Sequence, residues 1–205
     1  MVLVKNVPTT IEEIQDDIFI DFPSILTKNV SKYILGIKPE YHTGMFSDSM
    51  LKTENFSILK DSSEANSIHK VYITKMREIE NLKRGDLLII YRTKEKKSPN
   101  ANYSSVATSL CVVEENRHIS EFTQEAFIGY CKPHNIFTEA QLKQYYNNKE
   151  YPKIIKMTYN ISFKKRVTLG TLREIIEREP LYWGFAHLND DEFRIKQMNM
   201  LFIIT

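Results

Sequence analysis

The chain has 205 residues, of which 42% are hydrophobic and 26% are charged, a composition typical of an ordinary globular protein with one domain or at most two. This composition excludes disordered, collagen-like and fibrous classes. Only 6 residues are glycine, so a glycine-rich phosphate loop of a nucleotide enzyme has little material to be built from. The net charge of +2 argues against a protein that coats nucleic acid over its whole surface.

The cysteines and histidines indicate the redox compartment of the protein and whether it has a metal site. Cys111 and Cys131 occur in a chain without a basic start followed by an apolar signal core, which predicts reduced thiols in a cytoplasmic protein. No apolar run approaches the roughly 20 residues that span a bilayer, so we expect no membrane contact. The five histidines show no metal-ligand spacing, and we therefore expect no metal and no cofactor.

The first part of the chain differs in pattern from the rest. Residues 1–31 hold a short β-like piece at 2–4 and an acidic stretch whose apolar residues have roughly helical spacing. We expect these residues to form an extension or linker, and residues 32–205 to form one domain. A polar, aperiodic stretch at 60–67 is typical of an exposed loop.

Strand patterns dominate the middle of the chain. They predict strands at 71–74, 86–93 and 105–115, and the nearly continuous apolar run at 86–93 indicates a strand buried on both faces. The charged segment 94–104 then joins two strands of a hairpin and is free to contact a partner.

Helices and strands alternate in the second half. The pattern is helical between Ser120 and Tyr146, with an N-cap at Thr138, and strands follow at 153–161 and 163–169. Gly170 then begins a helix that Pro180 stops, and Asn189 or Asp190 caps a last one. This order predicts an α+β protein with a mainly antiparallel, closed sheet.

Three stretches of the sequence carry a family resemblance: YILGIKPEYHTGMFSDSMLKTE, IHKVYITKMREIENLKRGDLLIIYRTKEKK and SSVATSLCVVEE. The most specific features are Tyr72 in a strand, a basic helix, and the turn Gly85-Asp86 before an aliphatic strand that ends in Tyr91-Arg92. Over about residues 33–193 the chain resembles the PUA-like β-barrel superfamily, which includes PUA, ASCH, EVE and YTH domains. It is most similar to the PUA-like domains at the C-terminus of bacterial GNAT-type acetyltransferases.

The resemblance implies a PUA-like, mainly antiparallel β-barrel with peripheral helices that binds RNA or reads a modified base in a cleft. Two departures bear on activity. The chain has no acetyl-CoA loop of the Q-x-x-G-x-G/A kind. The ASCH signature Gly-x-Lys-x-x-Thr-x-Arg matches only at Gly36-Ile37-Lys38, which weakens an amidohydrolase interpretation.

Charge is unevenly distributed along the chain. Residues 1–69 have a net charge of −4, residues 70–120 of +4 and residues 121–205 of +2. Residues 151–173 contain six cations and no acid: Lys153, Lys156, Lys164, Lys165, Arg166 and Arg173. These cations form either a basic face suited to phosphates or a plain solvated surface.

Aromatic residues at strand ends and loops are candidates for stacking on a base. Tyr91 precedes Arg92 and Thr93 at the mouth of a strand, where a ring can stack and a guanidinium can bridge phosphate oxygens. Trp183, the only tryptophan, follows Tyr182 in a loop, where it is either a stacking platform or a plug for one end of the barrel.

Small polar residues offer two further possibilities. Ser104, Ser105 and Thr108 can hydrogen-bond the polar edge of a ligand or lie on a strand surface. A second group can orient an imidazole for acid–base work, although it includes no activated nucleophile. This group comprises Tyr41, His42, Asp48 and Ser49.

The leading hypothesis is a non-catalytic module that binds RNA or a modified nucleobase through a basic-aromatic cleft. Its candidate binding residues are Tyr91, Arg92, Thr93, Lys75, Ser104, Ser105, Tyr182, Trp183, Lys164, Lys165 and Arg166. One alternative is an ASCH-like amidohydrolase that acts on an acylated nucleoside with Lys38 or Lys75. The other is a regulatory partner of an acetyltransferase, in a toxin–antitoxin or defence system, that docks through residues 12–21.

Overall fold

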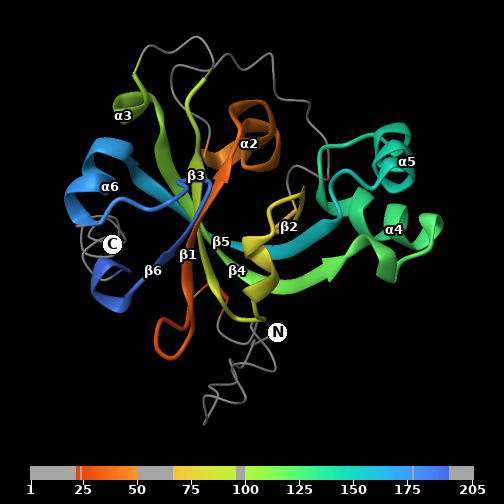
Figure 1. The fold of residues 1–205 in the computed structure, drawn as a ribbon, viewed down its shortest axis with the longest axis horizontal. Coiled ribbons are helices and arrows are strands. Elements are labelled where there is room, and N and C mark those ends of the chain that lie inside the picture. The colour runs from red at the N-terminus through yellow and green to blue at the C-terminus, as the bar shows by residue number, and fades with distance from the viewer. Residues whose placement is uncertain (1–21, 24, 50–66, 96–99, 177, 194–205) are drawn as a thin grey trace, which may run out of the picture.

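The computed structural model describes residues 22–23, 25–49, 67–95, 100–176 and 178–193, which form a six-stranded sheet with helices around it (Figure 1). The order across the sheet is β2-β5-β4-β3-β1-β6, and every neighbouring pair is antiparallel except β1 and β3. The strands are β1 (Lys32–Ile37), β2 (His69–Thr74), β3 (Leu87–Arg92), β4 (Val106–His118), β5 (Lys153–Thr168) and β6 (Phe185–Leu188). The predicted α+β, mainly antiparallel class is confirmed, and β2 and β6 form the two edges of the described sheet.

The helices lie at the periphery of the sheet. Figure 1 shows α4 and α5 together at one side of the molecule and α6 at the other. The helices are α2 (Pro39–Met45), α3 (Ala101–Ser104), α4 (Gln124–Cys131), α5 (Glu139–Asn148) and α6 (Leu169–Ile175), with 3-10 turns η1 (Ser47–Ser49), η3 (Glu78–Asn81), η4 (Ile119–Glu121) and η5 (Lys132–His134). No described helix has the length and apolar character needed to cross a membrane.

β3 is buried on both faces, as its continuous apolar run predicts, because a separate core packs on each side of it. On one side, here the α6 face, Leu87 and Ile89 pack with residues of α6. On the other, the α2 face, Leu88 and Ile90 pack with residues of α2. A third core, with Val71 of β2, lies beneath α4 and α5. Alternate residues of β3 therefore point into different environments.

The ladder between β4 and β5 contains a wide bulge. From Ala107 to Ser109 β4 advances by two residues, whereas the partner positions on β5, Val167 and Ser162, are five residues apart. Residues 163–166 thus form a bulge opposite Thr108. The sequence analysis treats 153–161 and 163–169 as two strands, and this is wrong: they are one strand, β5, whose irregular pattern marks the bulge.

Capping threonines determine where α5 and α6 begin. Thr138 caps α5 through a capping box with Gln141, as predicted. α6 begins at Leu169 rather than at Gly170, because the Thr168 hydroxyl accepts from Thr171 N, and it ends at Ile175, well before Pro180.

Other sequence predictions meet the structure in part. The helical region between Ser120 and Tyr146 is two helices joined by η5. Asn189 is confirmed as an N-cap, because it exchanges hydrogen bonds with Glu192. The strand predicted at 2–4, the acidic stretch before 22 and most of the loop at 60–67 lie outside the described residues. The boundary at residue 32 therefore stays a prediction.

Both cysteines are free and buried, as expected of packing residues. Burial raises the pKa of Cys111, and it raises the pKa of Cys131 to about 12. Neither thiol is therefore a ready nucleophile at neutral pH.

Glycine is required where β1 meets the loop before β6. Gly36 N donates to Gly184 O at 2.7 Å, and a Cβ on Gly36 would lie 2.8 Å from the Cα of Gly184. A real Cβ essentially never comes so close to backbone, so this approach is open only to glycine.

We expect Gly36→Ala to lower the free energy of unfolding by about 1–3 kcal/mol, because the added methyl group overpacks two backbones that cannot both move. The matched control is Gly129→Ala, in the exposed interior of α4, where a Cβ meets nothing within 4 Å. That change should raise stability by about 0.5–1 kcal/mol. Urea denaturation measures both values, and a Gly36→Ala protein as stable as wild type would contradict the expectation.

Candidate functional site

The structure separates the predicted aromatic residues from the predicted arginine. Tyr91 lies on the α6 face and is only 2% exposed, with its ring centroid 6.3 Å from that of Trp183. Arg92 is also 2% exposed, but as the next residue of β3 it points to the α2 face. Tyr91 and Trp183 therefore lie together, and Arg92 does not join them in one cleft.

Trp183 is held by a network of side chains beside α6. Its indole Nε1 donates to Glu179 Oε1 at 2.7 Å. Arg173 donates to both carboxylate oxygens of Glu179, at 3.2 and 2.9 Å, and its guanidinium lies 6.0 Å from the indole ring centre. Trp183 is also partly buried against the core of the α6 face, so it packs there rather than standing free as a platform.

Tyr182 is more available than its neighbour, because 56% of it is exposed. Although it precedes β6 at one edge of the sheet, it lies near enough to Tyr72 of β2, at the other edge, to affect its titration. Burial raises the pKa of Tyr72 to about 12, and the phenols of Tyr182 and Tyr41 add to the rise.

A buried polar cluster lies on the α2 face, and Thr108 is its centre. His42 Nε2 lies 2.8 Å from Thr108 Oγ1, and Arg166 Nη1 donates to Thr108 O at 3.1 Å. The Ser49 hydroxyl also donates to Thr108 O, at 3.4 Å. We call these residues, together with Tyr159 and Ser162, which lie 3.0 and 3.1 Å from Ser49 Oγ, the Thr108 cluster.

The bulge of β5 explains this cluster. Because β5 leaves the ladder opposite Thr108, backbone carbonyls there have no strand partner and need other donors. Arg166 donates from the bulge to the carbonyls of Thr108 and Phe163. One irregularity of the sheet thus places a guanidinium beside a buried histidine.

The electrostatics of the cluster are cationic. His42 is completely buried, and burial followed by the charges of Arg92 and Arg166 lowers its pKa to about 3, so the imidazole is neutral at physiological pH. Arg92 donates to Glu95 Oε1 at 2.7 Å. Arg166 is half-buried and has no carboxylate partner in the described part of the chain. Such a site attracts an anion or a carbonyl oxygen.

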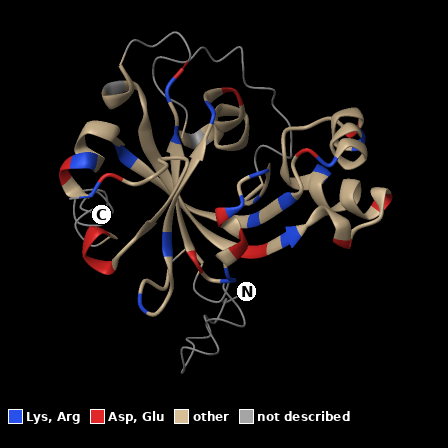
Figure 2. Ribbon diagram, in the orientation of Figure 1, with Lys and Arg blue, Asp and Glu red and all other residues tan. Residues whose placement is uncertain are grey.

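Only part of the predicted basic face has unpaired charge. Lys153 pairs with Glu80, Lys156 lies 3.2 Å from Glu114, and Arg173 is bound to Glu179. Figure 2 shows that acidic residues lie among the basic ones over much of the ribbon. Three consecutive cations on the bulge have no acidic partner among the described residues. We call them the bulge cations: Lys164, Lys165 and Arg166. Both lysines are exposed, and neither has a hydrogen bond or ion pair to any described residue.

The remaining predicted residues are scattered. Lys75, at the far end of β2, is exposed beside Tyr151 and pairs with Glu150 at 3.4 Å. Thr93 N donates to Ile37 O, which extends the β1–β3 pairing.

The two predicted serines belong to α3 and its cap. Ser104 donates within this helix, to Asn100 O at 2.7 Å. Ser105 is buried and hydrogen-bonds the Tyr91 phenol, whose pKa burial nevertheless raises. Neither serine belongs to the Thr108 cluster.

The catalytic alternatives find less support in this geometry. Lys38 and Lys75 are both exposed, whereas a lysine that acts as base or nucleophile usually depends on burial to lose its proton. The side chain of Asp48, the predicted partner of His42, lies outside the described residues, and the observed partner of His42 is Thr108.

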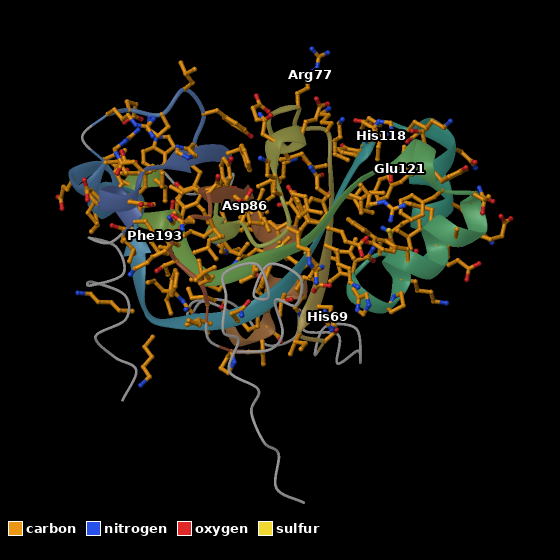
Figure 3. All side chains as sticks on the ribbon, turned by 90° about the horizontal axis from the view of Figure 1, so that it is seen from below. His69, Arg77, Asp86, His118, Glu121 and Phe193 are labelled. Carbon is orange, nitrogen blue, oxygen red and sulfur yellow. The ribbon has the colours of Figure 1, made fainter. Side chains whose placement is uncertain are left out.

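A second polar cluster, which the sequence analysis missed, surrounds Glu114 at another bulge of β4. Glu114 Oε1 accepts from Thr158 at 2.9 Å and lies 2.6 Å from His69 Nδ1. Burial raises the pKa of Glu114, but these hydrogen bonds and the charges of His69 and Lys156 outweigh it, and the net pKa is lowered. In Figure 3 His69 lies well apart from His118. Among the described residues no three His, Cys, Asp or Glu side chains form a metal site.

Comparison with known proteins identifies the fold. No protein-family model matches the chain, and no curated protein matches it significantly. The ASCH protein of Zymomonas mobilis is similar with a TM-score of 0.51 and 12% identity, over 82% of this chain and 95% of that one. A mutant of the same protein gives 0.50 and 10%, over 82% and 96%.

Human THYN1 protein, in a complex with DNA that contains 5-methylcytosine, has a TM-score of 0.42 at 12% identity, over 82% of this chain and 96% of that one. The similarity to the ASCH structures, at 10% and 12% identity, shows the fold. The chain has an ASCH-like PUA fold, and the predicted PUA-like architecture is confirmed.

The buried histidine makes stability depend on pH. Because the pKa of His42 is about 3 in the folded protein against 6.5 ordinarily, the unfolded chain binds a proton between these values and the folded chain does not. Protonation of His42 in the unfolded chain therefore does not lower the free energy of unfolding above about pH 6.5. Below that pH, and down to about pH 3, it lowers the free energy of unfolding by about 1.4 kcal/mol per pH unit. We expect His42→Gln, whose amide can still reach Thr108, to lack this part of the acid sensitivity. Urea titrations at a series of pH values measure the difference, and parallel curves for the two proteins would refute it.

Proposed function

We propose that this protein is a non-catalytic module that binds RNA or a modified nucleobase. The observation that carries the proposal is the set of bulge cations. Lys164 and Lys165 are exposed without partners among the described residues, and Arg166 connects them to the buried Thr108 cluster. A charged surface beside a polar interior suits a ligand with a phosphate backbone and a hydrogen-bonding base.

Each part of this arrangement has a role in the proposed complex. The two lysines attract phosphates by charge and release counterions on binding. Arg166 donates only from Nη1 to described residues, so its other N–H groups can serve a ligand. The ring of Tyr182, a residue that is 56% exposed, offers a stacking surface. The ASCH-like PUA fold agrees with the sequence resemblance that first suggested RNA.

Two finer predictions belong to the same proposal. The resemblance to domains that follow GNAT-type acetyltransferases suggests an acetyltransferase as a protein partner. The acidic segment 12–21, its proposed docking element, lies outside the described residues. We retain this partner as a prediction beside the nucleic-acid ligand, and a pull-down that survives deletion of that segment would count against it.

Reversing the charge of the bulge lysines tests the nucleic-acid ligand. The double variant Lys164→Glu/Lys165→Glu should bind labelled single-stranded RNA at least about tenfold more weakly at low salt, because two phosphate contacts are lost. The slope of log affinity against log salt should fall by about 0.7 for each contact. Fluorescence anisotropy at several salt concentrations measures both quantities.

The matched control is Lys143→Glu/Lys149→Glu, which makes the same change of charge at exposed positions of α5 and its cap. It should leave RNA binding within about twofold of wild type if only the bulge contacts phosphate. RNA binding that does not depend on salt, or an equal loss in both double variants, would refute the proposed interface. Arg92 is unsuitable for this test because its guanidinium already donates to Glu95.

A further inference from the structure

His42 has a hydrogen-bonding atom that no described residue uses. Its side chain is completely buried and neutral, and Nε2 lies 2.8 Å from Thr108 Oγ1, but Nδ1 has no hydrogen-bond partner in the described part of the chain. Buried polar atoms in folded proteins almost always have a partner, so an orphaned one at a candidate binding site needs an explanation.

The hydrogen bonds of Thr108 indicate whether His42 Nδ1 acts as a donor or as an acceptor. The Thr108 hydroxyl lies 3.3 Å from Ile90 O, which can only accept a proton. When the hydroxyl donates there, it accepts from Nε2–H of His42, and the single proton of the neutral ring is on Nε2. Nδ1 then presents a lone pair and requires an N–H or O–H donor.

Arg166 offers the complementary role next to it. His42 and Arg166 both bind Thr108, the first through its hydroxyl and the second through its carbonyl, so the two side chains flank one residue. Arg166 is half-buried, donates only to backbone carbonyls, and has further N–H groups without a partner among the described residues. The acceptor and the donor thus belong to side chains that contact the same residue, and the charge of Arg166 acts on the imidazole.

We propose that His42 Nδ1 and the Arg166 guanidinium recognise the lactam edge of a nucleobase, where a ring N–H adjoins a carbonyl oxygen. The ring N–H donates to Nδ1, and the carbonyl accepts from Arg166. Uracil and guanine have this edge. Cytosine and adenine present an unprotonated ring nitrogen there, whose lone pair opposes that of Nδ1. This inference rests on the proposed function and specifies the class of base that the site reads.

The test uses three nucleosides and the full chain. Uridine has the lactam edge, 3-methyluridine carries a methyl group in place of the ring proton, and cytidine has no ring proton. We expect uridine to bind at least about tenfold more tightly than either of the others, as measured by NMR titration, because the loss of the N–H leaves Nδ1 without a partner.

Two substitutions assign the effect to one nitrogen. The amide of His42→Gln replaces Nε2 and retains the contact with Thr108 but has nothing at Nδ1, so it should bind uridine and 3-methyluridine equally. The shorter His42→Asn places an amide oxygen near the position of Nδ1 and should retain preference for uridine. Binding of RNA through the bulge lysines reports whether each variant is folded.

Several outcomes would overturn the inference. Equal binding of uridine and 3-methyluridine by the wild-type protein would do so, as would a preference for uridine that survives in His42→Gln. If wild type binds RNA with the expected salt dependence but discriminates among no nucleosides, the lactam inference fails and the proposed function stands. If it binds neither RNA nor nucleoside, both fail.

Discussion

The bond from Arg166 to the carbonyl of Thr108 connects the irregular part of the sheet to its polar interior. A bulge as wide as the one in β5 leaves backbone acceptors without strand partners, and in a buried position such groups are costly. A guanidinium meets this need well, because it can serve two carbonyls and still have donors to spare. The same residue therefore completes the fold and brings a positive charge to the cluster.

This charge also acts on the buried histidine. Complete burial, followed by the charges of Arg92 and Arg166, keeps His42 neutral, so the cluster combines fixed cations with an uncharged imidazole. Ser49 adds hydroxyl contacts to Tyr159 and Ser162, and it links η1 to β5. Polar groups of this kind are stable only when nearly all are satisfied, and the exceptions therefore carry functional information.

Local signals in the sequence predict the local structure well. The apolar run of β3 predicts a doubly buried strand, and Thr138 predicts the start of α5 because a capping hydroxyl acts on residues three positions away. Features that depend on pairing between distant residues are less accessible. Tyr91 and Arg92 are neighbours in sequence and look like one site, yet alternation in a strand places them on opposite faces.

The candidate site shows the same limit. Thr108 and His42 are recognised as polar candidates, but only the register of β4 and β5 brings Arg166 to them. The basic stretch is visible in the sequence, whereas its neutralisation is not, because Glu80 reaches Lys153 from a distant 3-10 turn. A charge pattern along the chain shows which residues are basic. Whether their charge is available to a ligand depends on which acidic side chains the fold places beside them.

The position of β1 between β3 and β6 has a consequence for how the chain is assembled. β1 is hydrogen-bonded to β3 on one side and to β6 on the other, so the first described strand needs the last one to complete its pairing. Contacts so distant in sequence form slowly, because the chain loses the entropy of closing the loop before the strand pairing stabilises it. During synthesis β1 would lack its pairing with β6 until the ribosome releases the C-terminal part of the domain. The Gly36–Gly184 contact, which joins these two ends, would then be among the last to form.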